Sequence, residues 1–374
     1  MPSITNIVDS GLKNYLINGR LDYWQRGTTS SVNITTNSTN SSGYLADRFG
    51  YKAFKSTNNQ AYTWTREVDV PQDAVLNSEL SYSIRCTANA NHSYDNSDIC
   101  VPFYQLVEGN FMRDIQLNDE LCINFWLKSN ATGYMPTAIS IGSYYRVAYI
   151  QYDTPNTWKK YRVVFRLDNN ALSFAKDNTA GMGIYFLTSA NTSGNWGAAN
   201  TATWNSSAKY TVIGCSNWGA TAGNWVQMAG ISVTKSKTVL NTVPLAARSV
   251  FDELSLCQRY YEKIYIPSST YMALYVLEIS TNRFRGQFIS YKTPKRTAFP
   301  AGSFTAGIGS NAKWVSGSTI VSAADTTGLT VDTDSDGWKL RQTRVAGGTT
   351  PTVGYTYQYS SDFTVTLDSE FSTI

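Results

Sequence analysis

The sequence of 374 residues offers few groups that could catalyse a reaction. Its single histidine, His92, lies in the polar segment NANHSYDNSD, and no G-x-S-x-G motif accompanies it. Serine and cysteine nucleophiles usually need a histidine beside them as the general base. Zincin, P-loop and G-x-G-x-x-G motifs do not occur. We therefore interpret His92 as a solvated loop residue and predict that the chain uses no cofactor.

Glycoside hydrolysis is the one reaction that the composition leaves open, because it needs only two carboxylates at a suitable separation. The chain has 27 acidic residues, and no spacing rule identifies such a pair in a sequence. A repeat of the kind that builds a parallel β-helix is not visible. We predict that the chain is not an enzyme, and a polysaccharide depolymerase stays as an alternative.

The segment DTDSDG is the candidate for a metal site. Asp332, Asp334 and Asp336, followed by Gly337, match the first half of a calcium-binding loop. The twelfth position of that loop is Thr343 rather than glutamate, and no flanking helices are indicated. A polar β-turn explains the segment better, so we predict no metal site and keep the three aspartates as the alternative.

Aromatic side chains in a long polar loop are the remaining chemistry. The loop spans residues 189–223, is rich in Gly, Asn and Ser, and carries Trp196, Trp204, Tyr210 and Trp218. Sugar rings stack on such aromatic faces while amides bind their hydroxyls. We predict these four residues as ligand-binding, and the alternative is that they plug the edge of the fold or bury themselves in a subunit contact. Trp24, Trp126 and Trp225 lie in strand-like segments and are expected in the core.

The elements that must hold these loops are mostly strands. The chain has 25 Tyr, 15 Phe and 10 Trp but only 16% charged residues, a composition that favours strands joined by polar turns. Alternation of apolar and polar residues predicts a series of short strands, of which residues 120–129 are the clearest. Helical crossovers are not indicated. We therefore predict an all-β fold, an antiparallel jelly-roll β-sandwich with one linking helix and a second small β domain.

The linking helix is predicted at Ser249–Lys263, where Val250, Leu254, Cys257 and Tyr261 recur at helical spacing. Ser249 can cap its first turn, with Asp252 completing a capping box. The predicted domains are a lead-in with an Asn18-Gly19 hairpin at 1–30, the sandwich at 31–243, the helix at 244–264 and a β domain at 265–374. The stretch 29–43 is expected to be a polar loop.

Charge and cysteine usage narrow the partners. The net charge is +4 without a basic stripe, so we expect no nucleic-acid binding. Five cysteines without a CxxC pair predict buried free thiols. The beginning of the sequence has no apolar signal-peptide core, and no apolar stretch is long enough to span a membrane, so we expect no membrane insertion.

Four phrases of the sequence resemble those of bacteriophage tail-fibre and related virion surface proteins. LINGRLDYWQRGTT and YLADRF are similar to their N-L-x-I-N-G…W-Q-R-G and A-D-R-[WF] phrases, through Asn18, Gly19, Trp24–Gly27 and Ala46–Phe49. INFWLKSN at 123–130 is similar to a strand phrase that also occurs in carbohydrate-binding jelly rolls. LSLCQRYYEK at 254–263 looks like the phrase that ends their sandwich, and past residue 264 the match is loose.

The resemblance implies a virion surface protein, made in the host cytoplasm, that binds a host cell-surface glycan and contacts other virion proteins, often as a homotrimer. We therefore expect a tail-fibre-like or head-fibre-like adhesin. The alternatives are a structural capsid decoration or tail connector protein without glycan binding, and the depolymerase. Members of this group often carry a long N-terminal anchor or coiled coil, which is not seen in this sequence.

Overall fold

The structure is a computed structural model that divides into two compact units. Unit 1 runs to Glu253, and unit 2 is Leu254–Glu370. The described residues are 13–34, 39–55, 60–72, 80–235, 248–266, 271–278, 283–286, 289–297, 301–304, 312–316, 319–321, 326–333, 336–344, 356–359 and 363–370. Within this part of the chain, no helix is long and apolar enough to cross a membrane.

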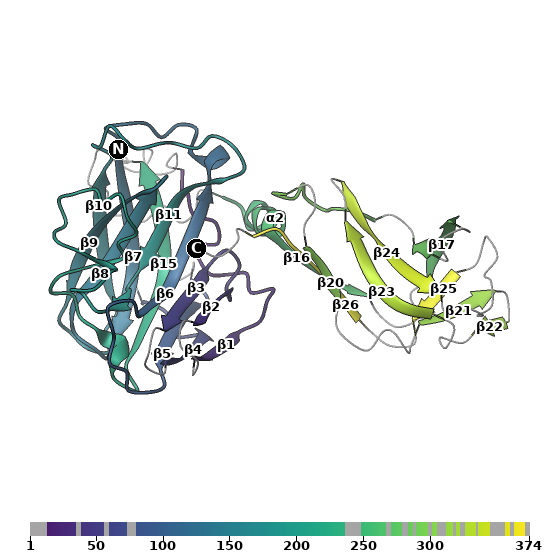
Figure 1. Ribbon diagram of the computed structural model, residues 1–374, viewed down its shortest axis with the longest axis horizontal. Coiled ribbons are helices and arrows are strands. Elements are labelled where there is room, and N and C mark those ends of the chain that lie inside the picture. Colours follow the sequence, from purple (N-terminus) through teal and green to yellow (C-terminus); the bar gives the residue numbers. More distant parts are fainter. Residues whose placement is uncertain are drawn as a thin grey trace, which may run out of the picture. The chain divides into compact units, whose positions relative to one another are not determined.

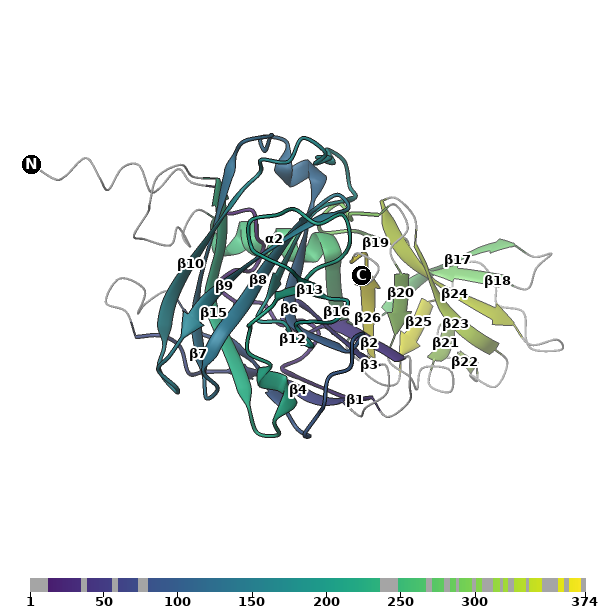
Figure 2. The same cartoon turned by 60° about the vertical axis from the view of Figure 1, so that its left-hand side comes forward.

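Unit 1 is an antiparallel jelly-roll β-sandwich, as the strand pattern predicts (Figures 1 and 2). Sheet A contains, in spatial order, β1 (Thr29–Ile34), β4 (Gln60–Glu67), β5 (Ser83–Ala88), β15 (Trp225–Lys235), β7 (Glu120–Ser129) and β10 (Lys159–Arg166). Sheet B contains β2 (Thr39–Tyr44), β3 (Gly50–Lys55), β6 (Ile99–Glu108), β11 (Ala180–Phe186), β8 (Gly133–Ile141) and β9 (Tyr144–Tyr152), with β12 (Ser189–Ala190) beside β6. Short elements η2 (Gly109–Met112), β13 (Gly197–Ala198), β14 (Thr211–Val212) and η3 (Trp218–Ala220) lie in the connections.

The core of unit 1 lies between the two sheets. On β7 the residues Leu121, Ile123, Phe125 and Leu127 are fully buried, because alternate positions of a strand face the same side. The ring of Phe125 meets Phe186 of sheet B edge-to-face at 5.5 Å between centroids. Each such ring contributes about 1.5–3 kcal/mol when it is fully buried. The side chains at the alternate positions of these strands therefore point away from the core, where they can contact other groups.

The Asn18-Gly19 hairpin predicted for the lead-in is wrong. Residues 13–28 contain no strand, and the segment instead bonds to β15, where the Tyr15 N–H donates to the Val233 carbonyl at 2.9 Å and the Ile231 N–H donates to the Gly19 carbonyl at 2.8 Å. Asn18 adopts a positive φ of 59°, and its side-chain amide donates to the carbonyls of Tyr23 and Asp47. A Cβ on Gly19 would lie 2.1 Å from the Ile231 carbonyl oxygen. The pair Asn-Gly is thus required by close tertiary contact rather than by a hairpin turn.

The stretch expected as a polar loop also forms strands. β1 and β2 lie within residues 29–44, where Val32 and Ile34 alternate with exposed polar residues and enter the core. β1 is an edge strand that pairs with β4 alone. Its two inward-facing apolar side chains are enough to attach it to the core. Composition alone did not indicate this alternation.

The predicted helix is confirmed as α2 (Val250–Tyr260), although it ends three residues early. The Asp252 backbone N–H donates to Ser249 Oγ at 3.1 Å, and that hydroxyl donates to the Asp252 carboxylate at 2.7 Å. Tyr261–Ile266 is strand β16, because its aromatic and β-branched residues pair with β26. Cys257 and Tyr260 form the buried face of α2, whereas the Val250 side chain is exposed.

The beginning of α2 is fixed to the lead-in within unit 1. The Asn18 backbone N–H donates to the Glu253 carboxylate, and Tyr23 Oη donates to the Val250 carbonyl at 2.5 Å. Arg248 pairs with Glu253 at 2.5 Å and donates to the Asn14 carbonyl at 3.1 Å. These bonds join the two ends of unit 1, which are far apart in sequence.

Unit 2 is the second small β domain and has two antiparallel sheets. The smaller sheet has the order β16, β26 (Phe363–Asp368) and β20 (Ala301–Phe304). The larger has the order β19 (Ile289–Ser290), β24 (Gly337–Arg344), β18 (Arg283–Gly286), β17 (Tyr271–Glu278), β25 (Thr356–Tyr359), β21 (Ala312–Ser316) and β22 (Thr319–Val321), with β23 (Thr326–Thr333) also beside β24. A buried ion pair joins Lys295 Nζ to the Glu262 carboxylate at 2.7 Å.

Candidate functional site

The outward face of sheet A carries a row of polar side chains in register. Gln227 of β15 lies opposite Arg85 of β5 on one side and opposite Lys128 of β7 on the other. The core-facing neighbours of these residues are fully or almost fully buried, so the alternation of each strand turns all three polar side chains to the opposite face. Sheet pairing thereby brings together residues that are far apart in the sequence.

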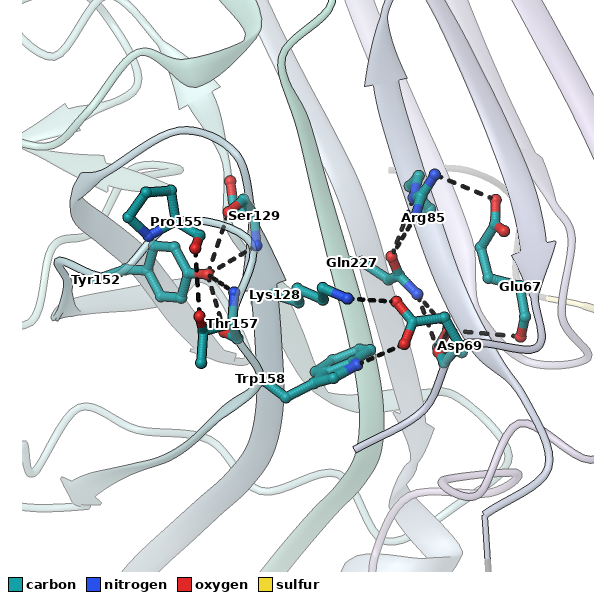
Figure 3. Close-up of polar contacts among 11 residues, drawn as sticks. Glu67, Asp69, Arg85, Lys128, Ser129, Tyr152, Pro155, Thr157, Trp158 and Gln227 are labelled. Carbon is teal, nitrogen blue, oxygen red and sulfur yellow. Dashed lines mark hydrogen bonds and ion pairs between the residues drawn. The ribbon is translucent and has the colours of Figure 1, made fainter. Parts of the chain in front are cut away.

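These side chains form a connected network with the start of the β4–β5 connection (Figure 3). Arg85 donates from Nε and Nη2 to Gln227 Oε1 at 3.0 and 2.8 Å. Gln227 Nε2 donates to the Asp69 carbonyl at 3.0 Å and to Ser83 Oγ at 2.7 Å. The Glu67 carboxylate lies 3.7 Å from Arg85 Nη1. The amide of Gln227 is therefore held in one orientation.

Asp69 is the centre of this network. One carboxylate oxygen accepts from Lys128 Nζ at 2.7 Å, and the other accepts from the Trp158 indole N–H at 3.1 Å. Burial raises the pKa of Asp69, but the hydrogen bonds from Lys128 and Trp158 and the charges of Lys128 and Arg85 together lower it by more. The pKa of this carboxyl therefore lies below its ordinary value, and the carboxylate is an acceptor rather than an acid.

Tryptophan rings border the network. The Arg85 guanidinium lies 4.5 Å from the ring centroid of Trp225, and Lys128 Nζ lies 6.0 Å from that of Trp158. Trp126 and Trp158 also pack against buried Leu80 and Ala229. All three tryptophans are half-buried, so the expectation that Trp126 and Trp225 belong to the core is wrong. They lie on the outward face, where packing orients each ring and leaves part of it exposed.

The turn before β10 places Trp158 at the border of the network. The Tyr152 hydroxyl is buried and binds both the N–H and the carbonyl of Ser129, each at 3.1 Å. It also donates to the Thr157 carbonyl at 2.9 Å, directly before Trp158 (Figure 3). We call Glu67, Asp69, Arg85, Lys128, Trp158 and Gln227 the sheet A array.

The sheet A array can bind hydroxyl groups but is poorly suited to proton transfer. Carboxylate oxygens accept hydrogen bonds, ammonium and guanidinium groups donate them, and indole rings offer apolar faces. Gln227 is fully buried, so its amide positions Arg85 rather than meeting a ligand. Lys128 and Arg85 keep 20% and 27% of their side-chain surface exposed, and Asp69 keeps 39%. A ligand could therefore reach atoms whose positions are already fixed.

Two of the four predicted loop residues are buried, and their prediction as ligand contacts is wrong. Trp218 is 1% exposed, and its indole N–H donates to the Leu187 carbonyl at 2.7 Å. Tyr210 is also buried, with its ring centroid 4.7 Å from that of Tyr185. A stacking ligand needs a free ring face, which neither side chain has. The alternative of an aromatic plug describes both residues.

Trp196 and Trp204 are half-buried and hold the long loop to the sandwich. The Trp196 indole N–H donates to the Ser97 carbonyl at 2.7 Å, and that of Trp204 donates to the Asp168 carboxylate at 3.0 Å. Arg146 bonds to the same Asp168 oxygen at 3.0 Å. Ligand binding by these two tryptophans stays a prediction, although their N–H groups are already used by the protein.

His92 is buried, so its interpretation as a solvated loop residue is wrong. Its Nε2 lies 3.3 Å from an oxygen of the fully buried Asp98, and its ring meets Tyr94 at 4.2 Å between centroids. The expected buried thiols are confirmed, since all five cysteines are free and buried. In the described ranges no three His, Cys, Asp or Glu side chains gather as a metal site would require.

The alternative calcium segment lies only partly within the described residues. Asp332 belongs to β23, where it lies opposite Lys339 of β24, and Asp336 is exposed just before that strand. Asp334 lies outside the described residues. The strands on either side of the DTDSDG segment, β23 and β24, are antiparallel neighbours. A β-turn between them requires this arrangement.

No family model matches the sequence, and no curated protein matches it. Among solved structures, it is similar to the enzymatically active domain of bacteriophage CBA120 tailspike protein 4, with 12% identity, a TM-score of 0.29, and coverage of 60% of this chain and 21% of the tailspike chain. It is similar to the module TmCBM61 in complex with beta-1,4-galactotriose, at 10% identity, TM-score 0.26, and coverage of 60% and 99%. A triple-jelly-roll protein from an archaeal virus turret is similar at 8% identity, TM-score 0.21, and coverage of 91% and 78%. At these TM-scores the similarities carry no argument about function.

Proposed function

We propose that this chain is a non-catalytic phage virion adhesin, tail-fibre-like or head-fibre-like, that binds host surface glycans at the sheet A array. The observation that carries the proposal is the joining of Asp69, Lys128, Gln227 and Arg85 into one network bordered by half-buried tryptophans. Hydroxyl-binding groups beside apolar rings are what a sugar surface requires.

The middle of the opposite face supports this choice by being closed, although Tyr134 and Tyr149 on β8 and β9 are 42% and 47% exposed. The outward tyrosines Tyr104 and Tyr185 of sheet B are 1% and 2% exposed, and Tyr210 of the long loop covers Tyr185. A Cβ at Gly50 would lie 2.5 Å from the Tyr104 ring, so glycine lets that ring lie flat on the sheet. The array on sheet A is therefore more accessible than the middle of sheet B.

The virion assignment rests on the four sequence phrases described above, and the non-catalytic assignment rests on chemistry. Glu67 and Asp69 are the two carboxylates of the array, and a glycosidase needs one of its two as a protonated acid. The lowered pKa of Asp69 is the opposite of what a general acid requires. We propose that binding is shallow and is strengthened by several copies of the chain, as a homotrimer would supply.

A glycan array probed with the purified chain tests the proposal. We expect binding to host surface polysaccharide that falls about tenfold or more in Trp158→Ala and in Trp225→Ala, since losing one stacking ring costs about 1.4 kcal/mol or more. Trp24→Ala is the matched control, because this tryptophan is also half-buried but lies in the lead-in, outside the array and the long loop. A folded chain that binds no glycan, or whose glycan binding is unchanged in both Trp158→Ala and Trp225→Ala, overturns the proposal. Release of reducing sugar from the polysaccharide would favour the depolymerase instead.

A further inference from the structure

A second concave surface lies apart from the sheet A array, where the β5–β6 connection meets the long loop. It is a cavity of about 480 Å³ in unit 1. His92, Asn191, Thr192, Cys215, Asn217 and Ala220 are among the residues that line it. Cavities that bind small molecules in proteins have volumes of about 300–1,000 Å³. The size alone therefore admits a small ligand.

The walls of the cavity are fixed by bonds between its segments. The His92 backbone N–H donates to the Ala220 carbonyl at 2.8 Å, which joins the connection to η3. Ser189 Oγ donates to the Asn217 side-chain oxygen and accepts from the Gly219 N–H at 3.0 Å. A site whose walls are already ordered loses little entropy when a ligand binds.

The lining selects for a neutral ligand with hydroxyl groups. Asn191, Thr192 and Asn217 offer amides and a hydroxyl, groups that both donate and accept as a sugar hydroxyl does. Burial raises the pKa of the Cys215 thiol and of the Tyr94 phenol, so both are neutral at pH 7.

We propose that this cavity is a second binding site, for a neutral saccharide unit. The site uses none of the residues of the sheet A array, so it does not depend on the proposed function. Together the two sites would let one chain hold a glycan at two points. Such paired contacts raise overall affinity without any new contact at either site.

Cys215 supplies a probe inside the cavity. It is 9% exposed, whereas the other four cysteines are 0–2% exposed, so a neutral maleimide at pH 8 should alkylate Cys215 first. N,N′-diacetylchitobiose, lactose and maltose are the neutral probes, and glucuronic acid is the anionic comparator. A probe present at ten times its dissociation constant leaves about a tenth of the sites empty, so alkylation should slow about tenfold.

Two alanines in the same segment give the variant and its control. Ala220→Trp fills the cavity, while Ala222→Trp places the same ring on the exposed side two residues further on. By calorimetry we expect a neutral saccharide to bind the native chain and Ala222→Trp, and to lose at least tenfold in affinity for Ala220→Trp. Trp158→Ala should bind it normally, which separates this site from the sheet A array. Three results overturn the proposal. They are absence of protection by all three neutral probes at about 100 mM, which leaves only dissociation constants above about 100 mM, equal affinity in Ala220→Trp, and stronger protection by glucuronic acid.

Discussion

Asp69 is the residue whose removal tests the sheet A array most directly. Asp69→Ala removes the acceptor for Lys128 Nζ at 2.7 Å and for the Trp158 indole N–H at 3.1 Å. The carbonyl of residue 69, which accepts from Gln227 and Ser83, belongs to the backbone and remains. The change therefore removes the orientation of Lys128 and Trp158 and leaves the loop attached.

The cost in stability should be small. Asp69 and Lys128 are partly exposed, so their ion pair contributes about 0.2–1 kcal/mol. The hydrogen bond from Trp158 adds about 1 kcal/mol. We expect Asp69→Ala to lower the free energy of unfolding by about 1–2 kcal/mol, measured by urea denaturation, so the variant stays folded.

The loss of binding free energy should be a larger share of its total than the loss of stability is. Losing the orientation of one stacking ring and one donor removes about 1.4 kcal/mol of binding free energy, or about a tenfold change in Kd. Calorimetry with the best polysaccharide from the glycan array measures it, and Asp153→Ala is the control, because Asp153 accepts from Lys159 outside the array. An unchanged Kd in Asp69→Ala, or a loss of more than about 3 kcal/mol of stability, would refute the reasoning.

Three further predictions follow from the same contacts. Trp218→Ala should lower the free energy of unfolding by about 3–5 kcal/mol, while Trp204→Ala should cost about 1 kcal/mol, as compared by urea denaturation. Lys295→Met should cost about 3 kcal/mol in the unfolding of unit 2, because it leaves the buried Glu262 carboxylate with only the more distant Lys292 at 3.6 Å, and adding Glu262→Met should recover most of the loss in a double-mutant cycle. The lowered pKa of Asp69 means that its stabilising effect is complete above its ordinary pKa of about 3.9 and is lost as the pH falls through the lowered value, so a urea series should show the difference between native and Asp69→Ala vanish only below about pH 4.

The strands of the β-sandwich could be predicted where apolar residues alternate within a single segment. Strand β7 has the predicted bounds, because Leu121, Ile123, Phe125 and Leu127 occupy alternate positions and turn residues flank both ends. The lead-in failed because its Asn-Gly pair meets requirements set by Ile231 and Tyr23, which are tertiary contacts. Local patterns report what a segment prefers, and close packing elsewhere in the chain overrides that preference.

The sheet A array could not be predicted from the sequence for a related reason. Asp69, Arg85, Lys128 and Gln227 come from four segments, and only the sheet order β5–β15–β7 makes them neighbours. The one available signal was the outward position of Lys128 in the alternation of β7. The sequence pointed to the loop tryptophans as the binding residues. The burial of Trp218, however, depends on distant segments that no local pattern could identify.

The long loop between β11 and β15 explains why binding should divide between two places. Tyr210 covers Tyr185 on the outward face of sheet B, which closes the middle of that face. Further along the same loop, Cys215 and Ala220 turn toward the β5–β6 connection and line the cavity. The loop then enters β15 at Trp225, beside Arg85 of the array. One segment thus closes one face, lines a cavity and leads into the array, so an insertion or deletion within it should disturb the cavity more than the array, whose remaining members are held by sheet A.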